Sequence, residues 1–142
     1  MHVQHSVHVE RDAKDCAAAL KDGPRWWFPH LDGEGLGKVK VRLMGVKVSK
    51  KVKAELGEVV TVGDWTKVRM AWKATFPTAL FPVMEGEVEL SPHDKGTTRL
   101  TVSGMYEPPL GKVGAWLDEA VMHNVAQATV KQLAEDIAER LR

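Results

Sequence analysis

The segment from about Pro109 to Arg142 most constrains the fold, because its pattern predicts one long helix. About 32 residues at about 1.5 Å per residue give a rod near 48 Å long, too long to be buried on all sides in one small domain. The helix must therefore lie across a large partner. The strand patterns that precede it supply the only one, and a hollow between sheet and helix is where we look for function.

The N-terminal part predicts a first strand over residues 3–9, with His5 on the same face as the valines. Two short helices are expected next. Asp12 is the predicted N-cap of the first, with Asp15 in the capping-box position, and Gly23–Pro24 should end it. The second helix should end before the strand patterns begin.

Residues 38–106 alternate between apolar and charged side chains, which predicts five or six further strands joined by tight turns. Successive strands of this kind form an antiparallel meander. Val52, Val60 and Val62 are expected on one inward face, with Gly57 bending or dividing the segment.

Outward charges of opposite sign lie on two successive strand patterns. The basic set is Lys67, Arg69 and Lys73, and the acidic set is Glu85, Glu87 and Glu89. Opposite charges on neighbouring strands are mildly favourable, which supports an antiparallel pair.

The segment from Lys38 to Lys53 holds seven basic residues and no acidic one. We interpret it as the solvated face of a sheet, because most of these residues alternate with valine and leucine. A patch for nucleic acid or anionic lipid is the alternative. No aromatic residue is interleaved with the basic ones, as a binder of single strands would need, so no nucleic-acid partner is expected.

Composition is that of one soluble domain spanning residues 1–142, with a net charge of +1. No apolar run is long enough for an integral membrane segment, and the N-terminus lacks a signal-peptide pattern. Cys16 is the single cysteine, so a cytoplasmic location is the expectation.

The C-terminal helix carries two apolar stripes when it is read at about 100° per residue. The longer stripe, expected against the sheet, contains Trp116, His123, Ala126, Val130, Leu133, Ile137 and Leu141. Glu119 lies on this stripe one turn before His123, so the two side chains could touch and form an acid–base pair facing a cavity. The alternative is that this end of the helix projects past the sheet and both side chains are exposed to solvent.

The segment GTTRLTVSGMYEPPLGKVGAWLDEAVMHNVAQATVKQLAEDIAERL resembles the closing part of START-like proteins, the SRPBCC superfamily of polyketide cyclases, dehydrases and lipid-transport domains. The order of predicted elements agrees over the whole chain. The resemblance implies an α+β helix-grip fold, in which a curved antiparallel sheet of six to seven strands wraps around the C-terminal helix. It also implies an elongated apolar cavity, but no single activity.

Our first hypothesis is therefore that the chain binds a small hydrophobic ligand, such as a lipid, isoprenoid or polyketide-like molecule, in that cavity. The candidate lining residues are Trp27, Met70, Trp72, Met84, Val102, Tyr106, Trp116, Glu119 and His123. Trp72, Tyr106 and His123 carry the polar tips that would orient a ligand.

Two alternatives stay open: a cyclase or dehydrase that uses Glu119 and His123, and a module that forms a homodimer or binds another protein. The latter would use the shorter helix stripe (Val113, Leu117, Val121, Val125, Ala128) and the FPTALFP loop at residues 76–82. No histidine or cysteine spacing typical of a metal site is present, so we expect no metal and no cofactor.

Overall fold

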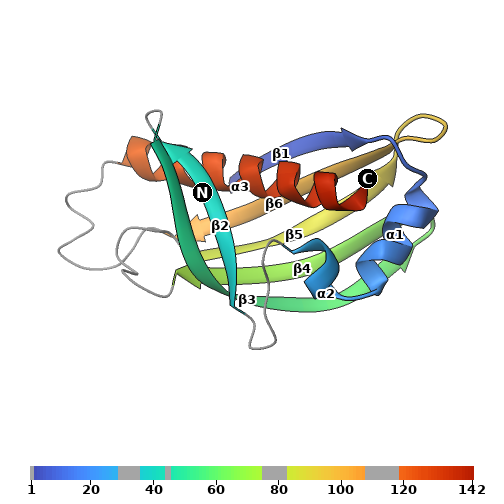
Figure 1. Ribbon diagram of the computed structural model, residues 1–142, viewed down its shortest axis with the longest axis horizontal. Coiled ribbons are helices and arrows are strands. Elements are labelled where there is room, and N and C mark those ends of the chain that lie inside the picture. The colour runs from blue at the N-terminus through green and yellow to red at the C-terminus, as the bar shows by residue number, and fades with distance from the viewer. Residues whose placement is uncertain (1, 29–35, 44–45, 75–82, 108–118) are drawn as a thin grey trace.

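The computed structural model describes residues 2–28, 36–43, 46–74, 83–107 and 119–142 (Figure 1). The elements in chain order are β1 (His2–Val9), α1 (Ala13–Lys21), α2 (Pro24–Trp27), β2 (Leu36–Leu43), β3 (Val46–Val62), β4 (Trp65–Ala74), β5 (Val83–Pro92), β6 (Thr98–Glu107) and α3 (Glu119–Leu141). This order matches the sequence prediction. The part of the expected long helix that precedes Glu119 lies outside the described residues.

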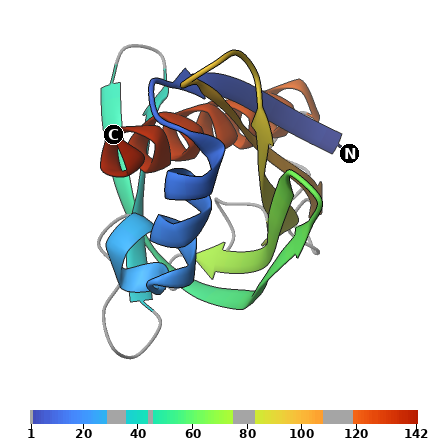
Figure 2. The same ribbon diagram turned by 90° about the vertical axis from the view of Figure 1, so that its right-hand side faces the viewer.

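The six strands form one sheet in the order β1-β6-β5-β4-β3-β2, and every neighbouring pair is antiparallel. Helix α3 contacts β1 and β2, the two opposite edges of the sheet, as well as β6. Both edges can reach one helix only because the sheet curls around it, as Figures 1 and 2 show. The α+β helix-grip prediction is thus confirmed, with six strands in the described part.

The inner stripe of α3 fills the curl of the sheet. Ala126, Val130 and Ile137 are fully buried, and Leu133 and Leu141 are almost so. Burying a leucine or isoleucine side chain contributes about 1.5–3 kcal/mol, so this stripe anchors the helix. The prediction that the longer stripe faces the sheet is confirmed for these residues.

Helices α1 and α2 cover one end of the sheet, the end at which α3 finishes (Figure 1). Cys16 and Leu20 of α1 are buried, and the indole N–H of Trp27 donates a 3.2 Å hydrogen bond to the carbonyl oxygen of Leu20. Asp12 occupies the N-cap position with an extended backbone, but its side chain makes no capping hydrogen bond. The predicted capping box is therefore wrong: both of its side chains are exposed to water, which competes for them.

Val60 and Val62 do not face inward as the alternation predicted; they are 54% and 73% exposed. The register of β3 against β4 shifts between Leu56 and Val59, where two residues of β3 lie opposite one of β4. One extra residue moves every later side chain to the other face. As a result Val59, rather than Val60, packs against the core.

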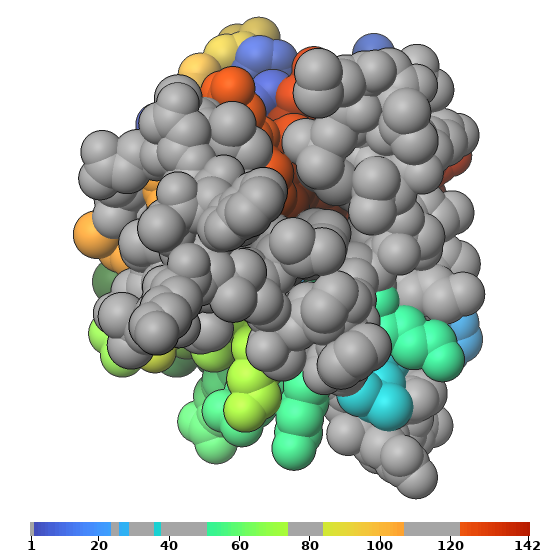
Figure 3. All heavy atoms as spheres, turned by 90° about the vertical axis from the view of Figure 1, so that its left-hand side faces the viewer, coloured from blue at the N-terminus to red at the C-terminus, as the bar shows by residue number. Residues whose placement is uncertain are grey.

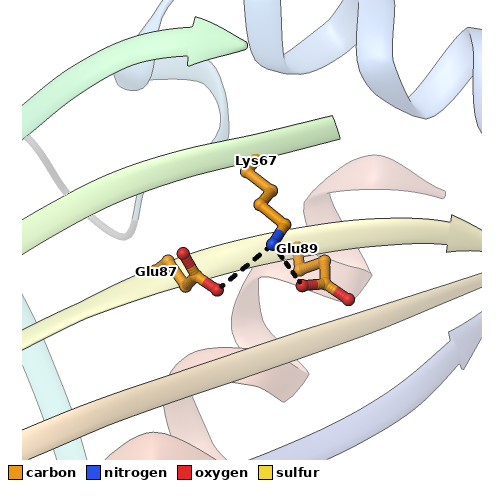
Figure 4. A network of polar contacts seen from close by, with 3 residues as sticks. All are labelled: Lys67, Glu87 and Glu89. Atoms are coloured by element: carbon orange, nitrogen blue, oxygen red, sulfur yellow. Dashed lines mark ion pairs between the residues drawn. The ribbon is translucent and has the colours of Figure 1, made fainter. Parts of the chain in front are cut away.

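The outward charges of β4 and β5 are paired across the strands, as expected for two of the three basic residues. Lys67 lies opposite Glu89 and Arg69 lies opposite Glu87. The Lys67 ammonium is 3.4 Å from Glu89 and 3.9 Å from Glu87 (Figure 4). Lys73 has no directly opposed glutamate: Glu85 lies opposite Ala71, one diagonal position from Lys73, and the partner of Lys73 on the other side is Lys53 of β3.

Candidate functional site

One row of the concave face brings together several of the candidate residues. Ala54, Trp72, Met84 and Tyr106 lie directly opposite one another across β3, β4, β5 and β6. All four are buried, and Met84 is completely so. The row therefore forms an apolar floor beneath the beginning of α3.

A hydrogen bond joins this floor to the helix. The Tyr106 hydroxyl lies 3.3 Å from Nδ1 of His123, and the two ring centres are 6.0 Å apart at 50°. Tyr106 is 2% exposed, whereas His123 is half-buried. With the phenol as donor, Nδ1 accepts, and a neutral imidazole then carries its proton on Nε2. The pair thus offers a donor and an acceptor beside an apolar surface.

Trp72 adds a second polar tip to the same row. The residue is 4% exposed. Its indole N–H is a donor from which a ligand oxygen could accept a hydrogen bond. The Trp72 backbone lies two strands from that of Tyr106, about 10 Å away at about 4.8 Å per strand spacing.

Other candidate residues occupy different places. Met70 and Val102 lie in the next rows of the buried concave face, and Trp27 packs under α1. Trp116 lies outside the described residues. Glu119 begins α3, but its side chain is also outside them, so contact between Glu119 and His123 stays a prediction.

Sequence reasoning did not include His5 among the candidate site residues. It lies opposite Val102 on β1, half-buried, on the face that packs against α3. The signal was available in the sequence, because His5 alternates in step with Val3 and Val7.

Two hollows that described residues line lie on the outer face of the sheet. One, of about 570 Å³, is bordered by Val60, Val62 and Trp65 together with Lys67, Arg69, Glu58 and Glu87. A second, of about 390 Å³, lies beside it around Gly57 and Arg69. Their walls mix both signs of charge, so neither selects one class of ligand.

Among the described residues, no three histidine, cysteine, aspartate or glutamate side chains come together as a metal site. None of the helices in the described ranges has both the length and the apolar character needed to cross a membrane.

Solved structures share this architecture over the full length of the chain. A protein from Thermus thermophilus superposes with a TM-score of 0.60 at 18% identity, covering 99% of this chain and 97% of its own. A START superfamily protein from Mycobacterium smegmatis superposes with a TM-score of 0.56 at 14% identity, covering 99% and 96%. This chain has the START-like helix-grip fold.

A conserved protein from Geobacillus kaustophilus gives a similar result, with a TM-score of 0.57 at 16% identity and coverage of 99% and 95%. No protein-family model and no curated protein matches the sequence. At such low identities the START-like likeness concerns the backbone alone, so function has to be argued from the residues of the concave face.

Proposed function

We propose that this START-like chain binds a small hydrophobic ligand between the concave face of its sheet and α3. The observation that carries the proposal is the Tyr106–His123 hydrogen bond beside an apolar row of Trp72 and Met84. Ligand sites of this type combine apolar walls with a few placed polar groups. Burial of the ligand's apolar surface, at about 25 cal/mol per Å², would supply the driving force.

The ligand that suits this arrangement is elongated and apolar, with an oxygen near one end. Such an oxygen could accept from Nε2 of His123 or from the indole N–H of Trp72. The half-buried state of His123 supports this role, because the ring contacts both the core and accessible space.

Native mass spectrometry of the purified protein tests the proposal directly, and a bound apolar molecule is the expected result. Binding of the probe anilinonaphthalene sulfonate gives an independent measure. An Ala54→Phe variant, which fills space beside Trp72, should remain folded and weaken probe binding at least tenfold. The matched control is Ala18→Phe on the exposed side of α1, which should bind normally. Unchanged binding in a folded Ala54→Phe protein would contradict the proposal.

The same hydrogen bond supports a second candidate, an acid–base enzyme of the cyclase or dehydrase type. A phenol and an imidazole in contact can relay a proton to a bound substrate. In that case Tyr106→Phe should lower kcat by about 10²-fold or more while changing KM little. A pure binder would instead show only a change in affinity.

A further inference from the structure

Like charges lie directly opposite one another on the outer side of the sheet. The register pairs Lys38 with Lys51 and Arg42 with Lys47 across β2 and β3, and Lys53 with Lys73 across β3 and β4. Directly opposed like charges destabilise a sheet. At the Lys53–Lys73 pair the fold therefore carries a cost that it avoids between β4 and β5, where Lys67 lies opposite Glu89.

These pairs belong to one continuous surface. Residues opposed in an antiparallel register lie on one face, and so do alternate residues of a strand. The positions on the face that Lys53 and Lys73 occupy, which we name the basic face, are Lys38, Lys40, Arg42, Lys47, Lys51, Lys53 and Lys73. Lys50 is excluded, because its partner is Val39 on the other side.

Three members of the basic face are described with their side chains, and Lys51, Lys53 and Lys73 are all exposed. Neighbouring positions are about 5 Å apart across strands and about 7 Å apart along them. Both spacings are shorter than the Debye length of about 8 Å at physiological salt, so the potentials of these charges add. Glu55 and Glu85 are exposed on the same face and lower the potential near Lys73. The basic positions outnumber these two carboxylates, so the surface is positive on a chain whose net charge is only +1.

The basic face adjoins the candidate ligand site. Lys53 and Lys73 come directly before and after Ala54 and Trp72 in their strands, which belong to the row that ends at Tyr106. Figure 3 views this end of the molecule, with side chains of α3 above and those of β3 and β4 below.

We propose that the basic face docks the protein on an anionic phospholipid bilayer, with the Tyr106 end of the concave face held near the lipid. The charge complementarity of a broad positive face to a negative lipid surface favours this partner. Single-stranded nucleic acid is less suitable, because no aromatic residue lies among the basic positions to stack on bases. The inference does not depend on which ligand the concave face binds.

Flotation with lipid vesicles tests the proposal. The wild-type protein should float with vesicles that contain equal amounts of phosphatidylcholine and phosphatidylserine. With vesicles of phosphatidylcholine alone it should remain in the bottom fraction. Each surface lysine adds a roughly fivefold preference for anionic lipid, so the triple variant K51Q/K53Q/K73Q should partition on the order of a hundredfold less. The control K14Q/K95Q/K131Q removes the same formal charge at three exposed sites elsewhere and should float like the wild type.

Three outcomes would overturn this inference. The first is equal flotation with neutral vesicles, and the second is equal loss of flotation in the two triple variants. The third is tighter binding, per phosphate, to a DNA duplex than to anionic vesicles. Circular dichroism establishes that both variants are folded. Tyr106→Phe serves as a further control, because it should leave flotation unchanged even if it abolishes binding of the anilinonaphthalene probe.

Discussion

Gly86 of β5 and Gly104 of β6 lie directly opposite each other, with no space for a side chain on the first. A Cβ built on Gly86 would lie 2.8 Å from the Cα of Gly104 and closer still to the carbonyl oxygen of Ser103. Both of these are backbone atoms, so neither can shift without distorting the sheet. The pair lets β5 and β6 approach closely where the sheet wraps around α3.

Gly86→Ala should therefore lower the free energy of unfolding by about 2 kcal/mol or more, because the strands must separate to admit the methyl group. The matched control is Gly57→Ala in the β3 bulge. There a Cβ would meet Arg69 atoms at 3.4 Å and 3.5 Å, which is ordinary contact, so its effect should stay below about 1 kcal/mol. Urea unfolding measures both. Equal stabilities of the two variants would show that the close approach does not constrain the sheet.

The sequence predicted the order of elements and most strand faces, because alternation reports directly on which side of a sheet is buried. It could not place the β3 bulge: two exposed residues, Gly57 and Glu58, fit an unbroken strand equally well. Val60 and Val62 were misassigned for this reason.

For the candidate site, too, the sequence predicted what depends on local pattern and missed what depends on contacts between distant segments. Periodicity placed Trp72 and Tyr106 on the concave face and His123 on the inner stripe of the helix. Nothing local to either segment states that residues 17 positions apart share a hydrogen bond. The like-charge pair of Lys53 and Lys73 was hidden for a similar reason, since it depends on the register between β3 and β4.

Burial raises the pKa of the Cys16 thiol above its ordinary value of 9.0, although a hydrogen bond with Thr98 and the charge of Arg11 act in the opposite direction. Below pH 9.0 the thiol is protonated in both the folded and the unfolded state, so its full contribution to the free energy of unfolding is present. As the pH rises further, the unfolded chain loses its proton first, so the folded state is progressively disfavoured.

Urea unfolding between about pH 8 and about pH 10 should accordingly show stability falling more steeply in the wild type than in Cys16→Ala. The variant will be less stable at every pH, because it loses buried sulfur, but that offset does not affect the slope. Parallel pH profiles would mean that the thiol ionises equally easily in both states.

Lys73→Glu should stabilise the fold while weakening docking to anionic vesicles. The change places a carboxylate opposite Lys53, and replacing a like-charge pair by an opposite pair should raise the free energy of unfolding by about 0.5 kcal/mol. Lys95→Glu, in the exposed turn between β5 and β6, is the control and should do neither. A residue with a purely structural role would not produce opposite effects on stability and docking. A loss of stability in Lys73→Glu would argue against the proposed cost of the basic face.

The Tyr106–His123 contact should appear as a coupling energy in a double-mutant cycle. Tyr106→Phe and His123→Ala each remove one side of the 3.3 Å hydrogen bond, and each also changes other contacts of its residue. The cycle cancels those other effects and leaves the pairwise energy, expected at about 1 kcal/mol. Tyr106→Phe combined with His8→Ala is the control: the His8 ring stacks on His93, 4.1 Å away, so this pair should be additive. If the first cycle were also additive, the phenol and the imidazole would act independently, and ligand orientation would have to rest on Trp72 alone.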